Sequence, residues 1–66
     1  MIEQVFSLQR DGNEQPQFYL LRFRYAGMGQ GYKQTIESGT EAYLRGVLTQ
    51  GGIPVNQINQ LFTNAH

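Results

Sequence analysis

The chain has 66 residues and a mass of 7.5 kDa, about half the commonest domain size, so we expect a single small domain over residues 1–66. Five basic residues balance five acidic ones and only 15% of the residues are charged, which excludes the basic composition of proteins that bind polyanions by charge alone. The chain has no cysteine, which excludes a disulfide framework, a thiolate nucleophile and a cysteine zinc site.

Side-chain amides dominate the polar residues, because nine Gln and four Asn outnumber the ten charged side chains. Amides solvate a surface without long-range repulsion between like molecules, and a net charge of zero removes the remaining repulsion. A domain of this length buries only about 60% of the surface that its unfolded chain exposes. We therefore expect association, either with a second copy as a homo-oligomer or with another protein.

No segment has the hydropathy of a membrane span. The longest apolar run is about four residues, against the ~20 that a spanning helix needs, and no basic-then-apolar leader opens the sequence. We expect a soluble, cytoplasmic protein without a membrane partner.

Three segments carry the signals of β-strands. Residues 1–9 place Ile2, Phe6 and Leu8 on one parity, although the alternation breaks at Gln4 and Val5. Residues 18–26 are rich in aromatic side chains and give the strongest strand signal of the chain. Residues 32–38 resume as a third strand.

Two turn-forming connections separate these strands. Residues 10–17 read RDGNEQPQ and predict a polar connection, and residues 27–31 read GMGQG and predict a hairpin turn. If Tyr25 lies opposite Tyr32, then Leu21 lies opposite Ile36 and the apolar parities of the two strands coincide. That register needs a two-residue turn at Met28-Gly29.

Two helices are predicted in the second half. Ser38-Gly39-Thr40-Glu41 fits a capping box with Ser38 as the cap residue, and Gly51-Gly52 provides a left-handed stop about three turns later. Pro54 suits the first position of a second helix. Apolar residues recur at helical spacing in both segments: Tyr43, Leu44, Val47, Leu48, Ile58, Leu61, Phe62 and Ala65.

This segregated order predicts an α+β fold, in which a three-stranded antiparallel sheet is followed by two helices that pack on one face. The predicted core joins the helical residues Tyr43, Leu44, Val47, Leu48, Ile58, Leu61 and Phe62 to the strand residues Leu21, Phe23, Tyr25 and Ile36. The other face of the sheet is expected to stay uncovered, with Phe18 and Leu20 on it and Val5 as a further apolar candidate. Such a face invites pairing with another protein.

The sequence contains few residues that could form a catalytic, phosphate-binding or metal-binding motif. The GMGQG segment resembles a phosphate loop only in composition, because a strand and not a helix follows it. His66 is the single histidine, and Asp11 and Glu14 are more typical of a solvated turn than of a cation site. We expect no enzyme and no catalytic, cofactor-binding or metal-binding residue.

The positive charge of the chain is concentrated in residues 22–33, which carry Arg22, Arg24 and Lys33 and no acidic residue. In the register above Arg24 lies opposite Lys33 on the uncovered face, next to Phe18 and Leu20. A solvated face with charges that oppose aggregation is one interpretation. The other is a partner-binding site made of Phe18, Leu20, Arg22, Arg24 and Lys33 that attracts an acidic protein surface.

Two functions remain open at this point. The favoured one is a small non-enzymatic interaction or regulatory protein that binds a protein partner and forms a homodimer. The alternative is a nucleic-acid-binding protein that uses the basic sheet face or a helix-turn-helix-like second half. The would-be reading helix argues against the latter, because Asn56, Gln57, Asn59 and Gln60 carry no positive charge.

Overall fold

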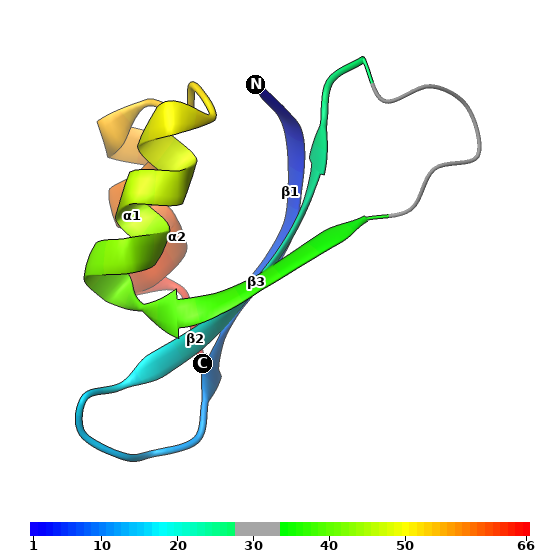
Figure 1. Ribbon diagram of the computed structural model, residues 1–66. Coiled ribbons are helices and arrows are strands. Elements are labelled where there is room, and N and C mark those ends of the chain that lie inside the picture. The colour runs from blue at the N-terminus through cyan, green and yellow to red at the C-terminus, as the bar shows by residue number, and fades with distance from the viewer. Residues whose placement is uncertain (28–33) are drawn as a thin grey trace.

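The computed structural model describes residues 1–27 and 34–66. Three strands are followed by two helices: β1 (Ile2–Asp11), β2 (Phe18–Tyr25), β3 (Thr35–Thr40), α1 (Glu41–Gln50) and α2 (Val55–Thr63). The strands form one antiparallel sheet in the order β1-β2-β3, and both helices lie on one side of it (Figure 1). The predicted α+β fold is confirmed. Neither helix of the described segments is long and apolar enough to cross a membrane.

The core lies between the sheet and the helices. Seven side chains make up its buried centre: Ile2, Leu8, Leu21, Phe23, Leu44, Leu48 and Ile58. Leu44 and Leu48 are four residues apart and therefore point from the same side of α1. Five residues of the predicted core are confirmed as buried: Leu21, Phe23, Leu44, Leu48 and Ile58. Four others are half-buried around them: Tyr25, Val47, Leu61 and Phe62.

Two bulges in β1 change which of its side chains reach the core. The register is irregular between Ile2 and Gln4 and again between Val5 and Ser7, so Glu3 and Phe6 are extra residues without a partner on β2. Each extra residue reverses the parity of the strand beyond it. Val5 consequently lies opposite the buried Phe23, whereas Phe6 leaves the core side. Phe6 therefore does not share a face with Ile2 and Leu8 as its parity predicted, and Val5 does not lie on the uncovered face.

The β2–β3 register differs from the predicted one by a single residue. Leu21 pairs with Glu37 and Arg22 with Ile36, so Ile36 points away from the helices and is 51% exposed. In this register Gly39 lies on the helix side of the sheet, where a Cβ would stand 2.7 Å from Cδ2 of Tyr43, so glycine at this position lets α1 lie close to the strand. The pairs predicted for Tyr32 and Lys33 lie outside the described residues.

Both ends of α1 are capped by local bonds. At the start, Thr40 Oγ1 accepts a hydrogen bond of 3.4 Å from the Tyr43 N–H, so the cap is Thr40 and not the predicted Ser38, which pairs with Leu20 inside β3. At the end, the N–H groups of Gly52 and Ile53 bond to the carbonyls of Thr49 and Leu48. This arrangement is a Schellman motif with Gly52 at φ +90°, so the predicted glycine stop is confirmed. Pro54 stands just before α2 as its N-cap residue.

Tyr43 does not join the core as predicted, because it lies at the rim of the sheet with 51% of its surface exposed. Its hydroxyl donates a hydrogen bond of 3.1 Å to Glu37 Oε1. The hydrogen bond and the negative charge of Glu37 favour the protonated phenol, which raises the pKa of Tyr43 above its ordinary value of 10.0.

We expect Glu37→Gln to bring the pKa of Tyr43 back toward 10.0, because the amide carries no charge to oppose ionisation of the phenol. The raised pKa stabilises the fold only while the phenol keeps its proton, so the contribution is present below pH 10 and is lost as the pH rises through the pKa of the folded state. An NMR titration of the Tyr43 ring measures the pKa. Glu41→Gln is the control, since Glu41 bonds to Arg45, and an unchanged pKa in Glu37→Gln contradicts the assignment.

Candidate functional site

The sheet face opposite the helices is the candidate site, and we call it the outer face. On β2 the outer face carries the side chains of Arg22 and Arg24. The alternate residues, Leu21 and Phe23, are buried on the side of the helices. The strand partners complete three rows across the sheet: Asp11–Phe18–Thr40, Gln9–Leu20–Ser38 and Ser7–Arg22–Ile36. Gln4 lies opposite Arg24 beyond these rows.

Large apolar side chains from all three strands are exposed on this face. Phe6 from β1 and Phe18 from β2 are each 45% exposed, and Ile36 from β3 is exposed to a similar extent. Leu20 is half-buried between Gln9 and Ser38. The face therefore carries more apolar surface than the Phe18 and Leu20 that the sequence predicted.

The two arginines of the outer face have different surroundings. Arg24 forms an ion pair with Glu3, donates a hydrogen bond of 3.3 Å to Gln4 Oε1, and has its guanidinium carbon 5.9 Å from the centre of the Phe6 ring. Arg22 is half-buried in its row, and its side chain makes no hydrogen bond or ion pair with another described residue. Its charge is thus available to a partner, whereas the charge of Arg24 is largely offset by Glu3.

The predicted site residues are brought together only in part. Phe18, Leu20, Arg22 and Arg24 share the outer face as expected from their two-residue spacing, and Lys33 lies outside the described residues. Phe6 and Ile36 were missed. The broken alternation at Gln4 and Val5 was a usable signal for a bulge, but the sequence holds no comparable signal for the position of Ile36.

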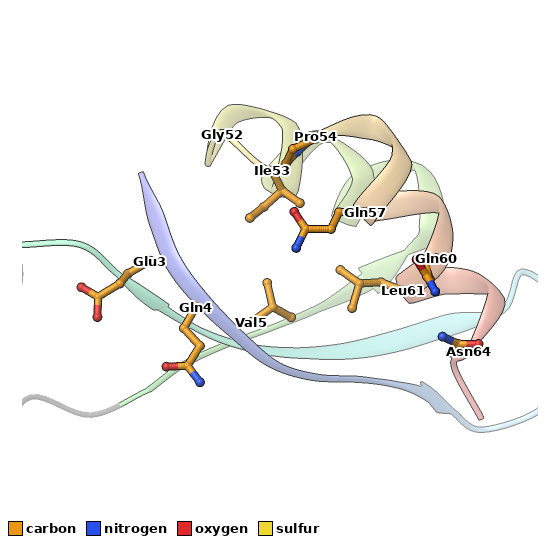
Figure 2. Close-up of a pocket in the computed structure, with 10 residues that line it drawn as sticks. All are labelled: Glu3, Gln4, Val5, Gly52, Ile53, Pro54, Gln57, Gln60, Leu61 and Asn64. Atoms are coloured by element: carbon orange, nitrogen blue, oxygen red, sulfur yellow. The ribbon is translucent and has the colours of Figure 1, made fainter.

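Two hollows in the described part of the chain border the outer face. One, of about 570 Å³, separates β1 from α2 and is shown in Figure 2. The other, of about 450 Å³, lies in the β1–β2 connection beside Asp11 and Glu14. Within residues 1–27 and 34–66 no group of three or more Asp, Glu or His side chains gathers in a way that could hold a metal ion.

In comparisons with known proteins, no protein-family model, no curated protein and no solved structure matches the chain.

Proposed function

We propose that the chain is a small non-enzymatic protein that acts by binding a protein through its outer face, and that the first protein bound there is a second copy of the chain. The observation that carries the proposal is the group of exposed Phe6, Phe18 and Ile36 around Arg22, on a sheet face that neither helix of the described segments covers. Exposed apolar side chains at the centre of a patch with polar groups at its rim are typical of protein interfaces.

Charge favours a second copy as the occupant. Besides the internal pair of Arg24 with Glu3, the outer face carries the cation of Arg22 on β2 and the carboxylate of Asp11 on β1. In a twofold dimer the same patch meets itself, so the arginine side of one copy can approach the acidic side of the other. The zero net charge of the chain adds no overall repulsion. A different partner would need acidic groups of its own to meet Arg22.

We expect the protein to self-associate at micromolar concentration and the double variant Phe18→Thr, Ile36→Thr to stay monomeric. Threonine keeps the strand preference of both positions while it removes most of the apolar surface. Sedimentation equilibrium at several concentrations measures the mass. The control is Val55→Thr, which removes an even more exposed apolar side chain (65%) from α2, away from the outer face.

Two results would contradict this proposal. A species of 7.5 kDa at every concentration would exclude the homodimer. A dimer that survives the Phe18 and Ile36 substitutions but is lost in Val55→Thr would place the interface on α2.

Nucleic-acid binding remains a second candidate because of one observation. Phe6 joins Phe18 on the outer face, so two aromatic rings lie on the same surface as Arg22 and Arg24, as in sheets that stack bases. The pairing of Arg24 with Glu3 weakens this candidate, since phosphate contacts supply most of the affinity of such proteins. Salt-dependent binding of a labelled single-stranded oligonucleotide that Phe18→Thr abolishes would favour it over the protein interface.

A further inference from the structure

The free edge of β1 holds a second surface, which adjoins the outer face at Glu3 and Gln4. The Ala26 N–H donates to the Met1 carbonyl (2.8 Å), and the direction of the N–H and C=O groups alternates from residue to residue along a strand. The even-numbered residues of β2 therefore direct these groups toward β1. The odd-numbered residues, which include Phe23, direct theirs toward β3. The β1 partners of those odd-numbered residues must then point their peptide groups away from β2: Ile2, Val5, Leu8 and Arg10.

The two ends of this free edge are closed by the second half of the chain. The Ile2 N–H donates to the Gly51 carbonyl (2.7 Å), and the Arg10 N–H donates to the His66 carbonyl (2.9 Å). Between these two bonds, Val5 and Leu8 make no backbone hydrogen bond to any described residue of the helical half. The helical half therefore bridges the edge of β1 at two points and leaves its middle open.

The hollow of about 570 Å³ lies at this open middle, and its volume is within the range of ligand sites. Val5 lines it from β1, and Ile53 and Leu61 line it from the helical half. Figure 2 shows Gln57 directed from α2 into the space above Val5, with Gln60 farther along the same helix and Asn64 just after its end.

The lining selects for an uncharged ligand. Among the described residues that line the hollow, Glu3 is the only one with an ionisable side chain, and it is paired with Arg24. The amides of Gln57, Gln60 and Asn64 both donate and accept hydrogen bonds, as does the outward peptide group of Val5. A purely apolar ligand would leave these groups without partners, and a charged ligand would lack a counter-ion. A peptide backbone offers donors and acceptors in alternation and can add to a strand edge.

We propose that the hollow between β1 and α2 binds a short, extended, uncharged peptide segment of another protein, which pairs with the peptide group of Val5 and is held on its other side by the amides of α2. The bonds at Ile2 and Arg10 limit the segment to a few residues. Ile53 and Leu61 provide the apolar contact for one of its side chains.

The test uses the blocked peptide acetyl-Thr-Val-Thr-Val-amide and the folded full chain. We expect saturable NMR shifts at the Val5 N–H and at the Gln57 side-chain NH₂. The same peptide with N-methyl groups on its two central residues should bind about tenfold or more weakly, because it cannot donate to a strand edge. Acetamide at equal concentration should cause no saturable shift.

A pair of variants locates the site. Gln57→Trp places a bulky ring in the hollow and should weaken binding about tenfold, whereas Asn56→Trp, on the neighbouring position of α2 that does not line the hollow, should leave binding within about twofold. Shifts confined to Phe18 and Ile36, equal binding of the N-methylated peptide, equal binding by Gln57→Trp, or no binding at millimolar peptide would each overturn the proposal. If Gln57→Trp fails to fold, the comparison of the two peptides on the unmodified chain decides it.

Discussion

Phe23→Ala should unfold this protein or bring it close to unfolding. The Phe23 side chain is 0% exposed, packs against the Tyr25 ring at a centroid distance of 5.0 Å, and lies in the buried cluster between sheet and helices. Truncation of a buried phenylalanine costs ~3–5 kcal/mol, because it loses both the burial of the ring and the contacts around the remaining cavity. That cost is comparable to the whole stability of a small domain, which is about 5 kcal/mol at the lower end.

The matched control is Phe18→Ala, which removes the same side chain from the same strand on the opposite face. We expect a change within about 0.5 kcal/mol, because Phe18 is exposed. Urea denaturation followed by circular dichroism measures both variants, at a protein concentration below the range of self-association. If the two alanine variants unfolded at the same urea concentration, the assignment of core and outer faces would be wrong.

Gly51→Ala should be the most damaging substitution at any glycine of the described segments. The φ of Gly51 is −76°, which alanine adopts freely, so no backbone penalty is involved. A Cβ at this position would instead collide with Ile2, standing 3.1 Å from its Cβ and closer still to Cγ1 and Cδ1. The collision would separate the Ile2 N–H from the Gly51 carbonyl and displace a buried core residue. Overpacking of this kind costs ~1–3 kcal/mol.

Gly46→Ala is the control, because this glycine lies exposed in the middle of α1 and a Cβ there meets no atom within 4 Å. Alanine at an exposed helical position should stabilise the protein by up to about 1 kcal/mol. The two glycine variants should therefore shift the melting temperature in opposite directions. A stabilised Gly51→Ala protein would mean that β1 does not pack against the end of α1 as described.

The elements with local signals could be predicted from the sequence. The aromatic run of β2, the spacing of Leu44 and Leu48, and the Gly51-Gly52 stop all act through neighbours in the chain, so the sequence predicts them without the fold. The cap of α1 was placed two residues early, at Ser38. Ser38 and Thr40 are both good caps, and only the length of β3 decides between them.

The strand pairings could not be predicted in the same way, and this limited the prediction of the site. Matching the apolar residues Leu21 and Ile36 is reasonable when the sheet is considered alone. The actual pairing of Leu21 with Glu37 places Gly39 against Tyr43, a contact between a helix and a strand that the apolar spacing of the two strands does not reveal. Phe6 was misplaced because a bulge is a feature of two strands, and its trace in one strand is only a broken alternation.

The bulges of β1 also bear on how the length of this strand can change. A deletion or insertion inside a strand usually inverts every side chain beyond it. In β1 the residues without partners are Glu3 and Phe6, so a chain that lacks both would read Ile-Gln-Val-Ser-Leu from Ile2 to Leu8, with Ile, Val and Leu still directed to the core. Deletion of Glu3 and Phe6 would therefore leave a regular strand with the same residues directed to the core. What the two inserted positions add is the carboxylate and the ring that surround Arg24, on the opposite side of the sheet from the core.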